Sequence, residues 1–175
     1  MEFTIRLATP RDLPAIVEIY NQAVAMRGAT ADLEPVTVEG RAAWLAEHDP
    51  ARYPVFLAER GGRLLGWCSL SPYRPGRTAL RHTAEISYYV DEGFRRMGVA
   101  SGLIAHAQRE APPRGIKTLF AILLDINEAS RSLLEKAGFG QWGHLLRVAD
   151  IDGTECGHLY YGLRLPEAEG PVAPG

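Results

Sequence analysis

The chain has 175 residues, 46% of them apolar, and a formal net charge of −2 from 19 Lys and Arg against 21 Asp and Glu. This length fits one domain, and the composition excludes a disordered chain, while the charge balance gives no reason to expect nucleic acid or a membrane as the main partner. No apolar stretch reaches the ~20 residues of a membrane helix, and no secretory signal opens the chain. Two isolated cysteines, Cys68 and Cys156, match no zinc pattern, so we expect no metal and a cytoplasmic protein.

The N-terminal half of the sequence predicts a strand, two helices and a hairpin. Thr9 and Pro10 fit the cap and the first position of a helix whose apolar residues recur at helical spacing. Thr37 marks the start of a second helix, and Gly61-Gly62 between two apolar runs indicates a hairpin turn. The predicted elements are a strand over 3–7, helices over 10–24 and from 38, and strands over 55–59 and 64–70.

The C-terminal half predicts four more strands and two more helices. A helix follows Gly98, and Asn127 and Gly138 fit the two caps of another. The run over 116–124 is almost continuously apolar, which is typical of a strand buried on both faces. The predicted strands cover 83–90, 116–124, 142–151 and 158–165. This order predicts a mixed α/β sheet flanked by helices in one domain over 1–165, followed by a mobile tail over 166–175.

Residues 88–101 are the most informative segment, because a strand there runs into a basic turn that opens a helix. The first N–H groups of a helix lack internal partners, and the helix dipole adds positive charge at that end. Gly98 lets the backbone approach an anion, and Arg95 and Arg96 add positive charge. The segment therefore predicts a diphosphate site, although these properties alone leave a plain turn with two solvated arginines equally open.

Two motifs resemble the signatures of the GNAT superfamily of N-acetyltransferases. The first signature, Q/R-x-x-G-x-G/A, is similar to R-R-M-G-V-A over 95–100. The second, N-x-A-S followed by L-x-E-K-x-G-F, resembles N-E-A-S over 127–130, Leu133 and E-K-A-G-F over 135–139. A narrower resemblance, to the phosphinothricin and methionine sulfoximine acetyltransferases, covers about residues 5–165. It rests also on Ile19-Tyr20-Asn21, Glu34-Pro35, Tyr53-Pro54-Val55 and Arg81-His82-Thr83-Ala84-Glu85.

The resemblance implies a GNAT-type mixed, mostly antiparallel sheet of six to seven strands flanked by about four helices. It implies transfer of an acetyl group from acetyl-CoA to the primary amine of a small molecule, an amino acid or an analogue, by a homodimer. The residues that it places at the cofactor are Tyr88, Tyr89, Val90, Arg95, Arg96, Met97, Gly98, Val99, Ala100, Ser101, Asn127, Ser130 and Lys136.

An amine with a pKa near ~10 is mostly protonated at neutral pH, so the reaction needs a base. The resemblance implies that Glu85 is this base, acting through water, and that a backbone N–H near Tyr89 or Val90 receives the developing negative charge. It also places Asn127 at the pantetheine or a bound water, so the predicted catalytic residues are Glu85, Tyr89 and Asn127. Many relatives carry Tyr or His where Leu134 stands, and Leu134 has no proton to donate, so three routes stay open: the thiolate leaves unassisted, it is protonated through water, or it is protonated by Tyr88 or Tyr89.

The loop over 72–81 supplies arginines suited to a substrate carboxylate, although a solvated basic loop remains an equal alternative. The predicted substrate-binding residues are Glu34, Tyr73, Arg74, Thr78, Ala79, Leu80 and Glu85. Three alternatives stay open: another amine or a protein N-terminus as acceptor, an acyl-CoA-binding or sensing domain with weak catalysis, and a structural dimer module.

Overall fold

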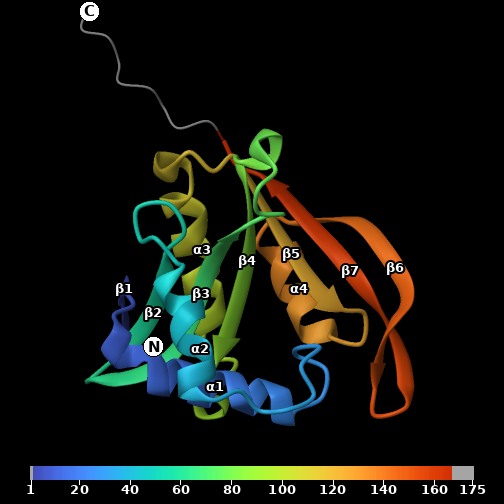
Figure 1. Ribbon diagram of the computed structural model, residues 1–175, viewed down its shortest axis with the longest axis horizontal. Helices are drawn as coiled ribbons and strands as arrows, with labels where there is room; N and C mark the ends of the chain where they lie inside the picture. The colour runs from blue at the N-terminus through green and yellow to red at the C-terminus, as the bar shows by residue number, and fades with distance from the viewer. Residues whose placement is uncertain (1, 167–175) are drawn as a thin grey trace, which may run out of the picture.

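One sheet of seven strands organises the computed structural model, which describes residues 2–166 (Figure 1). The strand order is β1-β2-β3-β4-β5-β7-β6, and only the β4–β5 pair is parallel. The predicted mixed, mostly antiparallel sheet is confirmed; of the predicted tail, residues 167–175 lie outside the described part. The strands are β1 (Thr4–Leu7), β2 (Val55–Arg60), β3 (Arg63–Pro72), β4 (Thr83–Val90), β5 (Thr118–Leu124), β6 (Gly140–Ile151) and β7 (Thr154–Arg164).

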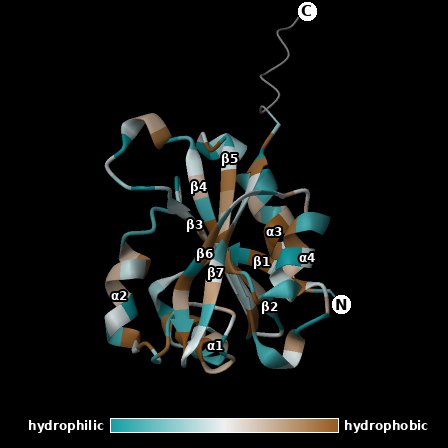
Figure 2. Cartoon of the chain, turned by 90° about the vertical axis from the view of Figure 1, so that its right-hand side faces the viewer, coloured by the Kyte–Doolittle hydropathy of each residue, from teal (hydrophilic) through white to brown (hydrophobic). Residues whose placement is uncertain are grey.

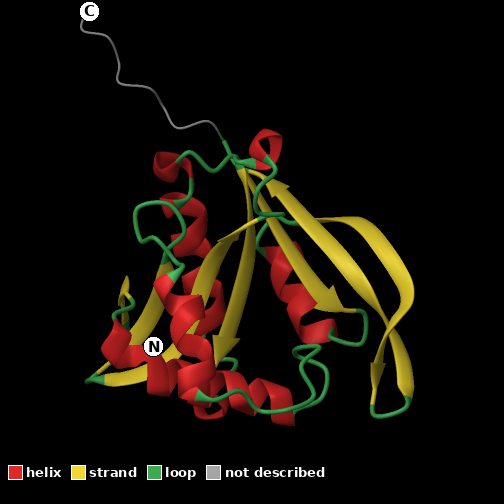
Figure 3. Cartoon of the chain, viewed as in Figure 1, coloured by secondary structure: helices red, strands yellow, loops and turns green. Residues whose placement is uncertain are grey.

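Four α-helices cover the two faces of the sheet, α1 (Leu13–Ala25) and α2 (Val38–Ala46) on one face and α3 (Val99–Glu110) and α4 (Glu128–Lys136) on the other (Figures 2 and 3). The predicted order of strands and helices is found along residues 2–166. Among these residues, none of the helices combines the length and the apolar character that a membrane crossing requires.

Most strands differ from their predicted bounds by one or two residues, and β7 differs by four. β5 begins at Thr118, two residues late, because Gly115 adopts a φ of 74° and the Ile116 N–H still donates to the carbonyl of Ala111 at the end of the preceding helix. β7 begins at Thr154, four residues early, because its pairing with β6 continues to the hairpin turn. That early part lacks the apolar alternation by which a strand is recognised in sequence.

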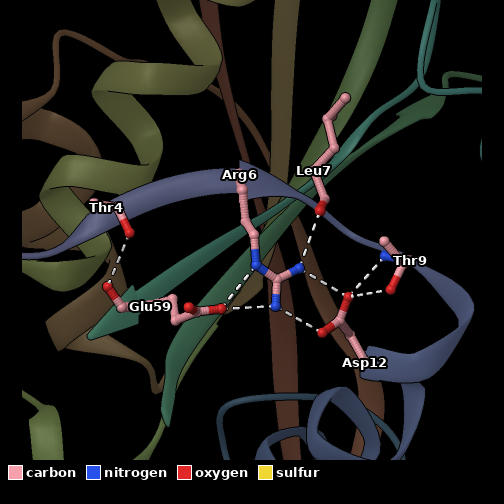
Figure 4. A network of polar contacts seen from close by, with 6 residues as sticks. All are labelled: Thr4, Arg6, Leu7, Thr9, Asp12 and Glu59. Carbon is pink, nitrogen blue, oxygen red and sulfur yellow. Dashed lines mark hydrogen bonds and ion pairs between the residues drawn. The ribbon is translucent and has the colours of Figure 1, made fainter. Parts of the chain in front are cut away.

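A polar network fixes the edge of the sheet to the start of α1 (Figure 4). The Arg6 guanidinium lies 2.7 Å from carboxylate oxygens of both Asp12 and Glu59. The N–H and the hydroxyl of Thr9 each donate to Asp12 at 2.8 Å, as the predicted helix start requires. Arg6 holds the pKa of Asp12 at about 2, so this network stays ionised at neutral pH.

The residues of β4 divide between the two faces of the sheet. Ala84, Ile86, Tyr88 and Val90 pack in the core beneath α3 and α4, whereas Tyr89 packs with Trp67 and the core of α1. β4 pairs with β5 only over Thr83–Glu85, opposite Thr118–Phe120. Beyond Glu85 the two strands separate (Figure 1), so the sheet is open at the end of β4 that precedes the basic turn.

Candidate active site

A cavity of about 620 Å³ lies where β4 ends, between α3 and α4. It is closed on a further side by Ala23, Met26 and Ala29 at and after the end of α1. All but one of the residues predicted to bind a cofactor line it. They are Tyr88, Tyr89, Val90, Arg95, Arg96, Gly98, Val99, Ala100, Ser101, Asn127, Ser130 and Lys136. The exception is Met97, which is not among the lining residues and whose side chain is 48% exposed.

The turn before α3 has the backbone geometry of an anion site. Arg96 and Gly98 both adopt left-handed conformations, with φ of 60° and 85°. A Cβ atom on Gly98 would meet no atom within 4 Å, so its open side faces free space. Within residues 2–166 the N–H groups of Val99, Ala100 and Ser101 have no hydrogen-bond partner. Left-handed turns and free N–H groups at a helix start form concave donor sites for anions.

The charge around this cavity is of one sign. Arg95, Arg96 and Lys136 line it, and its described lining residues include no Asp or Glu. The chain as a whole carries a net charge of −2, so positive charge is concentrated locally at this point. A cavity lined by these cations and by apolar walls from Val90, Leu133 and the end of α1 fits a diphosphate with a long, uncharged arm.

The main chain of β4 offers hydrogen bonds to this cavity. The N–H of Asp91 donates to Leu65 of β3 and the carbonyl of Thr83 accepts from Tyr73, so odd-numbered residues of β4 direct their main-chain groups toward β3. Because these groups alternate along a strand, those of Tyr88 and Val90 point to the opposite side. There β5 has separated from β4, so their N–H groups are directed into the opening.

Asn127 caps α4 and faces the same cavity. Its side-chain oxygen accepts from the N–H of Ser130 at 3.1 Å, which is the structural role that its position suggests. Leu134, about one turn beyond Ser130 on the helix, is buried. Tyr88 and Ser130 line the cavity beside them, and burial raises the pKa of the Tyr88 phenol to about 12, an effect that the Ser130 hydroxyl partly opposes. At neutral pH this phenol keeps its proton.

A second cavity, of about 230 Å³, lies on the opposite face of β4. Glu85, Ser87 and Tyr89 line it together, as their alternation along the strand predicts. Burial raises the pKa of Glu85 above its usual value, so this carboxylate binds a proton more readily than an exposed one. The remaining lining residues are Tyr20, Arg41, Trp44, Trp67, Ser69 and Ser71.

Tyr89 lines both cavities, so they meet at the open end of β4. Its ring stacks edge-on against Tyr20, with centroids 4.9 Å apart, and lies 4.7 Å from Trp67. The phenol is therefore part of the aromatic wall on the Glu85 side, whereas the Tyr88 side chain lies on the α4 side. Of the two tyrosines between which the sequence cannot choose, Tyr88 faces the cation-lined cavity.

The other predicted substrate-binding residues do not line the Glu85 cavity. Tyr73 packs against Phe120, the β5 partner of Glu85, with ring centres 5.1 Å apart. Thr78, Ala79 and Leu80 form a short helical turn in the green loop between β3 and β4 (Figure 1). Glu34 and Arg74 are exposed.

Sequence reasoning assigned no site role to seven of the nine residues that line this cavity, namely Tyr20, Arg41, Trp44, Trp67, Ser69, Ser71 and Ser87. Tyr20 and Trp67 read as ordinary core positions, and both are buried. Arg41 and Trp44 are three residues apart on α2, so their side chains lie on the same side of the helix. This pairing of a charged and an aromatic residue was the signal in the sequence that could have indicated a binding site. Within residues 2–166 no cluster of three or more His, Cys, Asp or Glu residues has the arrangement of a metal site.

Comparisons with known proteins bear directly on this arrangement. A sequence model of the acetyltransferase (GNAT) family matches residues 14–139. The chain is 44% identical over 151 residues to YwnH of Bacillus subtilis (strain 168), named as a candidate phosphinothricin acetyltransferase, with 86% of this chain and 91% of that protein covered. It is 32% identical to the L-methionine sulfoximine/L-methionine sulfone acetyltransferase of Pseudomonas aeruginosa, covering 94% and 96% of the two chains.

A solved structure gives the same result for the fold and the cofactor. The candidate acetyltransferase yncA from Salmonella typhimurium, determined with its cofactor acetyl-CoA, superposes with a TM-score of 0.89 at 29% identity, over 99% of this chain and all of that one. Phosphinothricin and methionine sulfoximine acetyltransferases are thus among the relatives, as the sequence motifs indicate. The chain belongs to the acetyltransferase (GNAT) family and is an N-acetyltransferase that uses acetyl-CoA.

Proposed function

We propose that residues 1–165 form one domain that acetylates the primary amine of a free amino acid or an analogue of the methionine sulfoximine, methionine sulfone or phosphinothricin type. The observation that carries the proposal is the meeting of two unlike cavities at the open end of β4. One has the cations and free N–H groups that a diphosphate carrier requires, and the other has a buried carboxylate. The relatives named for these amino acids support the same substrate class.

In this proposal the first cavity holds acetyl-CoA, which supplies the reactive thioester. The N–H groups of Val99, Ala100 and Ser101, with Arg95 and Arg96, bind the diphosphate. The N–H groups of Tyr88 and Val90 point into the opening of the sheet, where they can stabilise negative charge that develops on a carbonyl oxygen. Asn127 contacts the pantetheine arm or a bound water through its amide nitrogen, since its amide oxygen caps α4.

Glu85 removes the proton that the substrate amine must lose. Its cavity is apolar on several sides, so a carboxylate there is poorly solvated and its pKa lies above the usual value. A base whose pKa is raised toward neutrality is better matched to this task. The hydroxyls of Ser69, Ser71 and Ser87 surround the same space, so they can hold the water through which the proton passes.

Tyr88 gives its proton to the sulfur when the bond between carbon and sulfur breaks and its electron pair passes to sulfur. The phenol keeps its proton at neutral pH, faces the first cavity, and lies beside the buried Leu134, which has no proton to give. A free thiol has a pKa of about 8.5 and is therefore mostly protonated at neutral pH. The departing thiolate consequently takes up a proton, and a hydrogen-bond donor beside the sulfur stabilises it as it leaves. Solvent in the cavity returns the proton to Tyr88 after product release.

Replacing Tyr88 by Phe is expected to lower kcat roughly tenfold, because a hydrogen-bond donor to the leaving sulfur is removed. The loss should shrink for an acetyl thioester of a more acidic thiol, which leaves without help. Steady-state rates with acetyl-CoA and with such a thioester measure both effects. An equal loss with the two donors would show a packing defect instead of a proton-transfer role.

An acceptor screen tests the function as a whole. Purified protein is incubated with acetyl-CoA and a panel of amino-acid sulfones, sulfoximines, phosphinothricin, ordinary amino acids, polyamines and a peptide with a free N-terminus, and thiol release is followed. We expect turnover with members of the first groups. Binding of CoA without turnover of any amine would favour a sensing domain, and turnover of the peptide alone would move the acceptor to a protein N-terminus.

We further propose a homodimer in the cytoplasm, with β6 in the interface. β6 is an edge strand, and Leu146, Val148 and Trp142 on it are 70%, 54% and 56% exposed. Apolar side chains in a row on a sheet edge are typical of contact with another chain. Cys68 and Cys156 are buried without a disulfide, as suits a reducing compartment.

The dimer is expected to dissociate when Leu146 and Val148 are both replaced by Glu, because charges would then enter an apolar contact. Sedimentation velocity at micromolar concentration measures the change in mass. The matched control exchanges Arg109, which is exposed on α3, for Glu, and it should leave the dimer intact. Wild-type protein that sediments as a monomer at tens of micromolar would contradict the proposal.

A further inference from the structure

Among residues 2–166 the guanidinium of Arg41 has no partner of opposite charge, although it lies at the cavity of Glu85. Its central carbon lies 4.5 Å from the centre of the Tyr20 ring and 5.2 Å from that of Trp44. Within residues 2–166 its side chain forms no ion pair and no hydrogen bond. An arginine has five N–H donors, and a guanidinium stacked on aromatic faces still directs those donors outward at its edge.

The aromatic residues that hold Arg41 are themselves fixed. The Tyr20 hydroxyl donates to Asp32 at 2.6 Å, and the Trp67 indole N–H donates to the carbonyl of Ile16 at 3.1 Å. Trp44 packs against Trp67, with ring centres 5.5 Å apart. The guanidinium therefore lies on a rigid support, so little conformational entropy is lost when it binds a ligand.

Arg41 and Glu85 are the two charged residues among those that line this cavity, and they are of opposite sign. The volume of about 230 Å³ is that of a small ligand, and three serine hydroxyls lie between the aromatic walls. A ligand complementary to such a space carries an amine near the carboxylate and an anion near the guanidinium. A free amino acid has this pair of groups, whereas a polyamine or a peptide N-terminus lacks the adjacent anion.

We propose that Arg41 binds the α-carboxylate of the amino acid whose amine is acetylated at Glu85. Arg41 then selects free amino acids over amines without a carboxylate, because the unpaired guanidinium gains its missing partner only from the former. The inference rests on the proposed function and goes further, since it assigns carboxylate recognition to α2 instead of the arginine-rich loop over 72–81. Arg74 of that loop is exposed and does not line the cavity.

The test compares an amino acid that the wild type acetylates with the α-carboxamide of the same amino acid. For wild type we expect KM to be higher for the amide by about 10²-fold, the effect of removing one partner of a charged pair. Arg41→Gln should raise KM for the acid to the level of the amide while kcat stays within about threefold, and Arg41→Lys should restore part of the preference. Arg109→Gln on the far helix α3 is the matched control and should leave the preference intact.

Three outcomes overturn the inference. If Arg41→Gln keeps the preference for the acid, or if Arg74→Gln removes it instead, another group binds the carboxylate. If Arg41→Gln also weakens CoA binding, as measured by calorimetry, the role of Arg41 is structural. The same conclusion follows if the variant has a melting temperature so low that partial unfolding accounts for its higher KM. The proposed function fails separately: it is refuted when wild type acetylates no amino acid at all, a result that precedes any comparison of variants.

Discussion

Replacing Glu85 by Gln is expected to lower turnover by about 10² or more, because the amide cannot accept the proton that the amine must lose. The amide has nearly the same size as the carboxylic acid and fills the same place in the second cavity. Affinity for CoA should therefore stay near that of wild type, since the first cavity lies on the other face of β4. Steady-state kinetics with the best acceptor of the screen, together with calorimetry for CoA, measure the two quantities.

The pH dependence gives this prediction a second readout. Burial raises the pKa of Glu85, and the base acts only when it is deprotonated, so activity is lost as the pH falls through this raised value. We expect the acid limb of kcat/KM to have its midpoint above the ~4.3 of an ordinary glutamate, and to be absent in Glu85→Gln. Glu92→Gln, an exposed glutamate just beyond β4, is the matched control and should behave as wild type. Equal losses in turnover and CoA affinity in Glu85→Gln would indicate a folding defect.

Replacing Gly98 by Glu is expected to abolish CoA binding. Gly98 has a φ of 85°, which costs an L-residue roughly 1–2 kcal/mol, or about tenfold in an equilibrium. A side chain there would also project into the space that a diphosphate needs, and its charge would oppose the phosphates and offset Arg95 and Arg96. Isothermal calorimetry with CoA measures the loss directly.

Gly98→Gln separates charge from backbone strain and bulk. It has the same size and the same φ requirement as Gly98→Glu but adds no charge, so we expect it to bind CoA weakly where the acidic variant binds none. Melting temperatures of both variants without ligand test whether the fold is kept. CoA affinity unchanged in Gly98→Glu would refute the assignment of this turn as the diphosphate site, and with it the cofactor-binding residues of α3.

The order of elements was predictable because each is marked by short-range signals. Thr37 caps α2 by accepting from the Gly40 N–H at 3.0 Å, and Asn127 caps α4 in the same way. The buried β5 was visible as an unbroken apolar run, since both of its faces are covered. The start of β7 was not predictable, because its first residues are held by pairing with β6 and not by apolar alternation.

The opening of the sheet follows from the family resemblance and not from the residues of β4 themselves. β4 and β5 separate after Glu85. The separation depends on the packing of two strands that are distant in the chain, and the residue types over 86–90 do not predict it. The same holds for the choice between Tyr88 and Tyr89. Adjacent residues of a strand must face opposite sides, but only the helices that cover each face decide which side belongs to the cofactor.

The sequence by itself marked residues 88–101 as the candidate diphosphate site, with a plain turn as the equal alternative, since a turn, a glycine and the first N–H groups of a helix are contiguous and their geometry is local. The tertiary structure alone decided the Glu85 cavity. Tyr20, Arg41, Trp67 and Glu85 come from α1, α2, β3 and β4, and they meet only because both helices pack on one face of the sheet. The spacing of residues in the sequence does not predict contacts between distant elements, because those contacts form only when apolar surface is buried in the folded chain.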